Sequence, residues 1–257
     1  MIPLGSLRGF AFDLDGCIWA GSTLLPGARD LVAALRAAGR GVVFVTNSSR
    51  ERAAQIAERL SRLGIPAREP DVLAALDLLG EAIRRRKGPQ AVLPLGTREM
   101  GEVLEAAGHT VVAFDDWRRA GVVAVGNDPL FDFARLRAAS RAVAGGAALF
   151  AVNLDPRLPV APGEFDPGCG ALCEAVAVAG GARPEVVGKP HAPIFEMALE
   201  RLGRPAWPPR GSIPRAGATG RRTSSCPTSP GCWRPGRPLA PERRASVRAP
   251  AGLRGAC

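Results

Sequence analysis

The sequence of 257 residues contains no run of 18 apolar residues, and its start lacks the basic, apolar and small-residue segments of a secretion signal. Such segments mark membrane-spanning helices and exported chains. We therefore expect a chain that is neither inserted in a membrane nor secreted, with the cytoplasm as its default location. Because 46% of the residues are hydrophobic, the chain has enough apolar side chains to bury a core.

Patterns that bind transition metals are also missing. The six cysteines include no Cys-x-x-Cys pair, and the two histidines, His109 and His191, stand far apart in the chain. Structural zinc sites need several such ligands at short, regular spacing. The sequence therefore predicts neither a zinc site nor a disulfide framework.

Acidic residues almost disappear after residue 203. Residues 204–257 contain 11 Arg, 10 Pro, no Lys and a single acid, Glu242, which gives this segment a net charge of +10. The whole chain also carries +10, so residues 1–203 are neutral. A segment rich in Pro and Arg buries too little apolar surface to offset its ordering entropy. We expect a folded part over residues 1–203 and an aberrant, disordered tail over 204–257.

Apolar runs of strand length alternate with helical patterns over residues 1–203, which is typical of an α/β fold with a mainly parallel sheet. The first strands are predicted at 10–12 and 41–45, and the first helices at 26–39 and 50–63, the second with Ser49 as its N-cap. Later in the chain, strands are predicted at 91–95, 121–125 and 148–152, and helices at 131–143 and 193–202.

Two polar clusters follow the first two strands. Asp13 and Asp15 stand one residue apart, and they point the same way if the extended backbone continues past the first strand. Adjacent carboxylates need a cation or a shared proton, although a solvated strand end is the simpler alternative. Thr46, Asn47 and Ser48 follow the second strand. Because ligands bind outside the carboxyl ends of parallel strands, both clusters are expected to line one crevice.

A third cluster, Gly188-Lys189-Pro190, precedes the last predicted helix. It is not a P-loop, because the upstream Gly and the following Ser or Thr are missing, and for Lys189 alone a solvated surface lysine is the simpler interpretation. The three clusters together fit phosphoryl transfer. Asp13 can attack phosphorus while Asp15 protonates the leaving oxygen and later activates water. Lys189, Mg²⁺ and the Thr46 hydroxyl can offset the phosphoryl charge.

The order and spacing of these clusters resemble the haloacid dehalogenase-like (HAD) phosphatases. The run Leu25-Pro26-Gly27-Ala28 resembles the class IIA branch, which includes phosphoglycolate, pyridoxal-phosphate and nitrophenyl-phosphate phosphatases. The resemblance implies that Mg²⁺ is the cofactor. It also implies a role for each site residue: Asp13 as nucleophile and metal ligand, Asp15 as general acid/base whose backbone carbonyl binds the metal, Thr46 and Asn47 as phosphate contacts, and Lys189 as the group that holds nucleophile and phosphate together.

The same resemblance implies a Rossmann-like core interrupted by an inserted α/β cap domain. We expect the core at 1–76 and 184–203, the cap at 77–183 and the tail at 204–257. The runs Asn153-Leu154-Asp155 and 167–171 resemble cap segments that close over substrate, but ordinary turn chemistry explains them equally well, so no catalytic role is assigned to them. The expected partner is a small phosphorylated metabolite, and a homodimer formed through the cap is a further expectation.

The chain departs from the family where a fourth motif, Gly-Asp-x-x-x-Ser/Thr-Asp, should supply carboxylates for Mg²⁺. No Asp follows Asp166. One hypothesis is that the tail is translated in a shifted reading frame. With free codon bases chosen to suit, residues 222–236 can be read as Asp-Leu-Val-Val-Ser-Asp-Ile-Ala-Gly-Leu-Leu-Ala-Ala-Gly, which has the spacing of the motif.

Two alternatives to an active phosphatase stay open. One is an inactive HAD-like pseudoenzyme that binds phosphate esters without turning them over. The other is a binding protein whose basic tail engages nucleic acid or an acidic surface. Nucleic acid is disfavoured as a partner, because the tail lacks the interleaved basic and aromatic residues of such binding segments.

Overall fold

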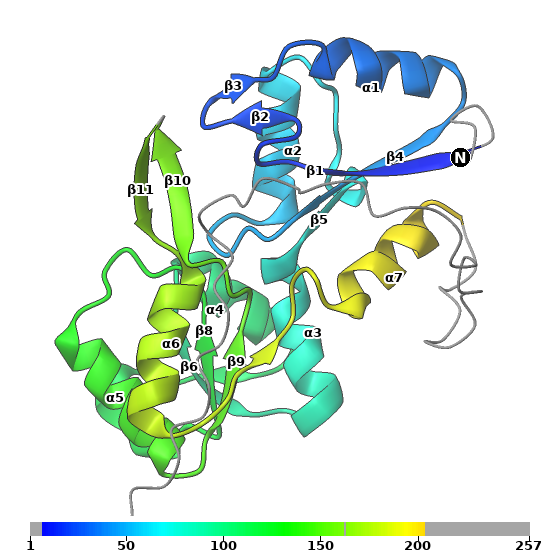
Figure 1. Cartoon of the computed structure of the whole chain (residues 1–257). Helices are drawn as coiled ribbons and strands as arrows, with labels where there is room; N and C mark the ends of the chain where they lie inside the picture. The colour runs from blue at the N-terminus through cyan, green and yellow to red at the C-terminus, as the bar shows by residue number, and fades with distance from the viewer. Residues whose placement is uncertain (1–6, 162, 204–257) are drawn as a thin grey trace, which may run out of the picture. The chain divides into compact units, whose positions relative to one another are not determined.

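The computed structural model of the protein describes residues 7–161 and 163–203 (Figure 1). The predicted tail, its shifted-frame reading and Glu242 lie outside the described residues. No helix in the described part is both long enough and apolar enough to cross a membrane. The alternation of helices and parallel strands confirms the predicted α/β fold with mainly parallel sheets.

The first sheet places the polar clusters side by side. Its strands run in the order β1 (Gly9–Asp13), β4 (Gly41–Thr46) and β5 (Val72–Ala74), all parallel. Alternate β4 side chains enter two different cores, since Phe44 packs with residues of α1 (Ala28–Ala37) and α2 (Ala53–Arg62), whereas Val43 and Val45 pack with residues of α7 (Ala192–Arg201). Asp13 is in register with Val45, so both strands end at the same edge.

A second sheet is inserted between β5 and α7 in the chain. Its parallel strands run in the order β12 (Glu185–Val186), β9 (Ala148–Ala151), β8 (Val122–Val125), β6 (Ala91–Leu95) and β7 (Thr110–Val111). Its helices are α3 (Ala75–Lys87), α4 (Arg98–Ala106), α5 (Phe133–Ala144) and α6 (Cys169–Gly180). Residues 185 and 186 fall in the predicted second part of the core, but they pair with β9 of this inserted sheet.

Two short hairpins and two 3₁₀ segments complete the described structure. The hairpins are β2 (Trp19–Ala20) with β3 (Thr23–Leu24), and β10 (Arg157–Ala161) with β11 (Glu164–Pro167). The 3₁₀ segments are η2 (Glu69–Asp71) and η3 (Phe114–Arg119). The hairpin β2–β3 follows directly after the Asp13 and Asp15 cluster.

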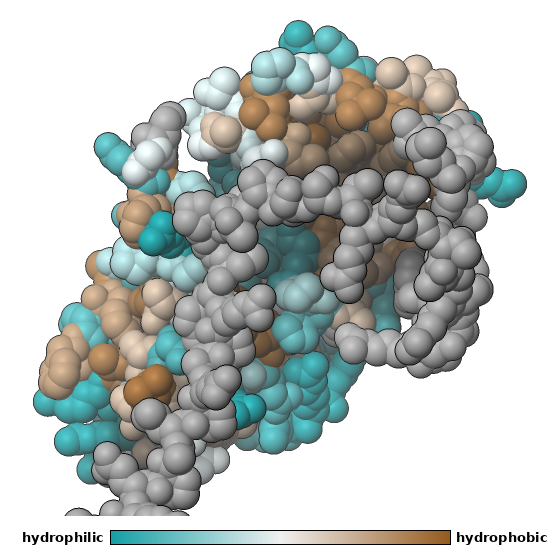
Figure 2. All heavy atoms as spheres, in the orientation of Figure 1, coloured by the Kyte–Doolittle hydropathy of each residue, from teal (hydrophilic) through white to brown (hydrophobic). Residues whose placement is uncertain are grey.

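The outer edge of the first sheet is apolar. Among the described residues, β1 pairs with β4 alone, so its other edge has no strand beside it. Figure 2 shows apolar atoms gathered in the region of α1 and β1. Phe10 and Phe12 of β1 are half-buried with ring centroids 6.2 Å apart, and Leu31 of α1 is 48% exposed. The described part of the chain therefore leaves apolar surface beside β1.

The start of α2 differs from the prediction. The helix begins at Ala53, and Ser49 does not cap it, because the Ser49 hydroxyl accepts a hydrogen bond from the backbone N–H of Asn127 (3.2 Å). Asp77 in α3 serves the helix end instead. Its carboxylate accepts bonds from the backbone N–H of Ala53 (2.7 Å) and from Arg52 Nε (2.9 Å). A cap supplied from another helix leaves no local signal in the sequence.

We predict that Asp77→Ala lowers the free energy of unfolding by about 1–2 kcal/mol, because it removes the acceptor for the first N–H of α2. Asp77→Asn keeps one acceptor oxygen and is expected to lose less. Urea denaturation measures both. Glu58→Ala, which removes an exposed acid from the same helix, is the control. Equal losses in Asp77→Ala and Glu58→Ala would show that the carboxylate does not cap α2.

Candidate active site

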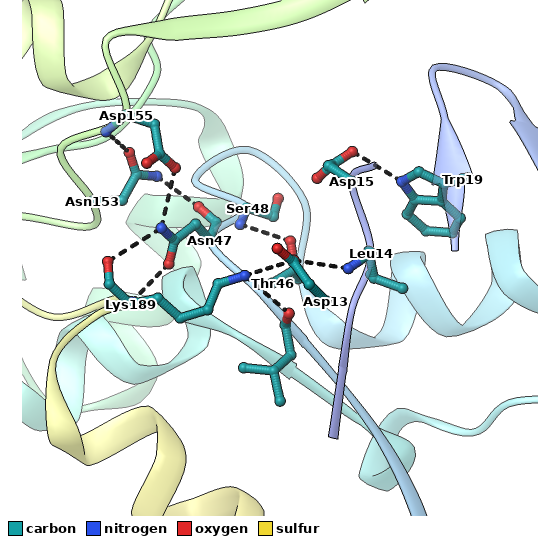
Figure 3. Close-up of polar contacts among 11 residues, drawn as sticks. Asp13, Leu14, Asp15, Trp19, Thr46, Asn47, Ser48, Asn153, Asp155 and Lys189 are labelled. Atoms are coloured by element: carbon teal, nitrogen blue, oxygen red, sulfur yellow. Dashed lines mark hydrogen bonds and ion pairs between the residues drawn. The ribbon is translucent and has the colours of Figure 1, made fainter. Parts of the chain in front are cut away.

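An ion pair joins the end of β1 to the loop before α7. Lys189 Nζ lies 2.6 Å from Asp13 Oδ1, and it also donates to the backbone carbonyl of Val45 at 3.3 Å (Figure 3). The same Asp13 oxygen accepts the backbone N–H of Leu14 at 2.8 Å. The lysine side chain is only 19% exposed, so the alternative of a solvated surface lysine is not what the structure contains.

Thr46 lies next to this pair at the end of β4. It follows Val45, the register partner of Asp13, and it is 2% exposed. Its hydroxyl oxygen accepts the backbone N–H of Ser48 at 3.1 Å. A hydroxyl that accepts one bond still has its own proton to donate. Thr46 can therefore donate to an anionic oxygen placed at the strand ends beside Asp13.

The Asn47 side chain holds the backbone of the lysine loop. Its Oδ1 accepts the N–H of Lys189 at 2.7 Å, and its Nδ2 donates to the Lys189 carbonyl at 3.3 Å and to Asp155 Oδ2 at 3.1 Å. A Cβ on Gly188 would lie 2.6 Å from Asn47 Oδ1, so only glycine leaves room for this carboxamide. Both ends of the carboxamide are thus used to place Lys189, and its phosphate contact stays a prediction.

Asn153 and Asp155 support Asn47 from the segment that follows β9. Asn153 is 4% exposed; its Nδ2 donates to the Asn47 carbonyl at 2.6 Å, and its Oδ1 accepts the N–H of Asp155 at 2.9 Å. The segment is held in turn by the glycine-rich loop, because the Gly170 N–H donates to the Asp155 carbonyl at 2.9 Å. A Cβ on Gly170 would lie 2.3 Å from the Leu154 carbonyl oxygen. Asn153 and Asp155 therefore hold Asn47 in place, and Gly170 holds Asp155.

Asp15 stands apart from the ion pair. The strand ends at Asp13, and the chain then turns, so the extended geometry does not continue to Asp15. Its exposed carboxylate accepts the indole N–H of Trp19 at 2.9 Å. Figure 3 shows this carboxylate beside the indole and separate from the contact between Asp13 and Lys189. Sequence reasoning did not identify Trp19, since a tryptophan four residues after a carboxylate is not a recognisable signal.

Two of the three cysteines in the described part of the chain, Cys169 and Cys173, are buried, whereas Cys17 is exposed. Cys169 lies at the start of α6, and its Sγ donates to the Val125 carbonyl at 3.4 Å. Burial raises the pKa of both Cys169 and Cys173 to about 12, so the two thiols stay protonated near neutral pH. Over residues 7–161 and 163–203, no three His, Cys, Asp or Glu side chains are grouped closely enough to hold a metal ion.

A hollow lies elsewhere on the first sheet. It has a volume of about 670 Å³ and opens at the beginning of β4, the end opposite to Thr46. Arg36, Arg40 and Arg201 line it, together with Leu202 at the end of α7. None of the residues around Asp13 and Lys189 borders this hollow. The candidate site therefore lies at the opposite end of the first sheet from this hollow.

The chain is similar to known proteins in both sequence and structure. Residues 10–110 match the family model described as haloacid dehalogenase-like hydrolase. Human chronophin is 35% identical over 211 residues, which cover 77% of this chain and 71% of chronophin.

Two solved structures are also similar. A p-nitrophenyl phosphatase from Archaeoglobus fulgidus has a TM-score of 0.69 at 31% identity, covering 77% of this chain and 75% of its own. A glycerol phosphate phosphatase from Mycobacterium tuberculosis, solved in complex with magnesium, has a TM-score of 0.69 at 29% identity, covering 76% of this chain and 58% of its own.

The thiols give a prediction on reactivity. At pH 8, brief treatment with iodoacetamide is expected to alkylate the exposed Cys17 and to spare Cys169 and Cys173, because a pKa of about 12 leaves almost no thiolate at that pH. Peptide mapping by mass spectrometry measures the three sites in one sample. Alkylation of Cys169 as fast as Cys17 would contradict the burial described above.

A second prediction concerns Asn153. Asn153→Ala leaves the Asn47 carbonyl and the Asp155 N–H without their partners, and we expect a loss of about 1–3 kcal/mol in the free energy of unfolding. Asp155→Asn is the matched variant, since it keeps an oxygen that can accept from Asn47. Thermal and urea denaturation compare the two. A loss that is larger in Asp155→Asn than in Asn153→Ala would contradict the support assigned to Asn153.

Proposed function

This chain belongs to the haloacid dehalogenase-like hydrolases of class IIA, a family of phosphoric monoester hydrolases, and from that premise we propose that it hydrolyses a small phosphorylated metabolite through an aspartyl-phosphate on Asp13. The observation that carries the proposal is the 2.6 Å contact between Lys189 Nζ and Asp13 Oδ1 at the carboxyl ends of parallel strands. This arrangement leaves a nucleophile beside a fixed positive charge.

In the first step, a carboxylate oxygen of Asp13 attacks the phosphorus of the ester. The bond from phosphorus to the leaving oxygen breaks, and the carboxylic acid of Asp15 gives its proton to that oxygen, so that an alcohol departs. Lys189 lies within contact distance of Asp13 and offsets the negative charge that carboxylate and phosphoryl oxygens bring together. The Thr46 hydroxyl donates to a phosphoryl oxygen.

In the second step, water attacks the phosphorus of the aspartyl-phosphate. Asp15, now a carboxylate, takes the proton from this water, and the bond between phosphorus and Asp13 breaks. Inorganic phosphate leaves, while Asp13 is restored as a carboxylate and Asp15 as an acid. Asn47 contributes by holding the backbone of Lys189 through both ends of its carboxamide.

Magnesium belongs to the proposal because one relative was solved with it bound, and Asp13 and the backbone carbonyl of Asp15 are the part of such a site that this chain supplies. The described residues do not complete it. Asp13 Oδ1 is occupied by Lys189 and Leu14, and no third acidic, histidine or cysteine ligand joins Asp13 and Asp15 in the described part of the chain. No step above is therefore routed through the metal.

The test is phosphate release from 4-nitrophenyl phosphate by the full chain, with added Mg²⁺ and with a chelator. We expect turnover in the wild-type chain and a loss of at least about 10³-fold in Asp13→Asn, since the amide cannot attack phosphorus. Asp30→Asn, an exposed position on α1, is the matched control and should keep full activity. Turnover that survives Asp13→Asn would overturn the assignment of the nucleophile.

Because the described residues supply only part of a metal site, binding of phosphate without turnover is the alternative outcome. If phosphate binds to the wild-type chain and no ester is turned over, the chain is a pseudoenzyme of this family. The coding DNA after residue 203 then separates two causes. A second frame that encodes Gly-Asp-x-x-x-Ser-Asp would support the frameshift hypothesis, whereas its absence in all frames would make the tail a genuine feature of the protein.

A further inference from the structure

We propose that Trp19 is a positioning residue for the general acid Asp15. The indole N–H of Trp19 donates to Asp15 Oδ1 at 2.9 Å, and the tryptophan is 2% exposed while the carboxylate is exposed to solvent. A buried, rigid donor thus holds an open carboxylate. This inference rests on the proposed function, because it assigns a partner to the residue that moves the proton.

The backbone between the two residues fixes their separation. The N–H groups of Cys17, Ile18 and Trp19 lie 3.2, 2.9 and 3.1 Å from the carbonyl oxygen of Leu14, and the Gly16 N–H donates to the Trp19 carbonyl at 2.8 Å. Leu14 and Ile18 are 0% and 1% exposed, so the turn is anchored in the core on both sides. The indole and the carboxylate are therefore placed by one closed turn.

Arg59 fixes the indole from a second element. This residue comes from α2, and its guanidinium carbon lies 4.3 Å from the centroid of the Trp19 ring. The same guanidinium donates to the Gly21 carbonyl of the β2–β3 hairpin and pairs with Glu51 at 3.5 Å. A cation over an aromatic face is attractive, so the contact resists rotation of the ring away from Asp15.

The hydrogen bond biases which oxygen carries the proton. An indole N–H is a donor only, and the carbonyl oxygen of a carboxylic acid is a stronger acceptor than its hydroxyl oxygen. When Asp15 is an acid, its proton is therefore favoured on Oδ2, with Oδ1 bonded to Trp19. Figure 3 shows the second oxygen directed away from the indole. Trp19 thus keeps the acidic O–H on the side of the carboxyl group that faces away from the indole.

The first arm of the test compares two esters with enzyme in excess, so that release of the leaving group is followed in a single turnover. Trp19→Phe keeps an aromatic ring and removes the N–H. We expect it to slow release of glycerol from glycerol 3-phosphate by about tenfold or more, because an alkoxide must be protonated as it leaves. Release of 4-nitrophenolate, which leaves without a proton, should change by less than about threefold.

Trp117→Phe is the matched control, because Trp117 is half-buried in η3 and has Arg118 over its ring. This variant is expected to leave both rates unchanged. Equal slowing of the two esters in Trp19→Phe, or no slowing of either, would overturn the positioning role. A wild-type chain that turns over neither ester would contradict the proposed function itself, and the second arm does not depend on turnover.

The second arm measures the indole N–H signals of the ¹⁵N-labelled full chain by NMR. The signal that Trp19→Phe removes should move in Asp15→Ala and exchange faster with water, and it should stay in place in Asp13→Ala. If Trp19→Phe does not fold, Arg59→Met identifies the same signal, because it removes the cation over the ring. A Trp19 signal that is unchanged in Asp15→Ala would show that the contact is absent and would overturn the inference.

Discussion

The pairing of Lys189 with Asp13 is the contact on which the rest of the site depends. It requires the loop before α7 to bring Lys189 Nζ within 2.6 Å of Asp13 Oδ1 and within 3.3 Å of the carbonyl at the end of the neighbouring strand. The parallel register of β1 and β4 brings Asp13 level with Val45, whose carbonyl receives the same ammonium group. Without the lysine, the Asp13 carboxylate would have no positive partner at the sheet edge. Its negative charge would then repel the oxygens of an incoming phosphoryl group.

Asn47 connects the lysine loop to the segment that follows β9 of the inserted sheet. Its side chain is bonded to the backbone of Lys189 and to Asp155, and its own carbonyl receives the amide of Asn153. The segment after β9 is therefore tied to the strand end that holds Thr46. A buried polar network of this kind is stable only when each member is satisfied. Glycines leave room for this network: a Cβ at position 188 would meet the Asn47 Oδ1 that accepts from Lys189, and a Cβ at position 170 would meet the backbone of Leu154.

Sequence reasoning located β1, β4 and the clusters around Asp13, Thr46 and Lys189, because strand periodicity and the position after a strand are local signals. Its errors have two physical causes. The Asp15 carboxylate turns to Trp19, four residues further on, because β1 ends at Asp13. Ser49 is the expected cap of α2, but the cap comes from Asp77 in another helix. The pairing of β12 with β9 and the bonds of Asn153 to Asn47 likewise join residues distant in the chain. Such partners cannot be read from neighbouring residues.

The central claim is that Asp13 carries the phosphoryl group, and trapping that intermediate tests it directly. The full chain would be mixed with a ³²P-labelled phosphate monoester, quenched in acid within one turnover and mapped by peptide. We predict a label on the peptide that contains Asp13, removed by hydroxylamine as expected of an acyl phosphate, and absent from Asp13→Asn. Rapid release of phosphate with no label on that peptide, or with the label on another residue, would contradict the account.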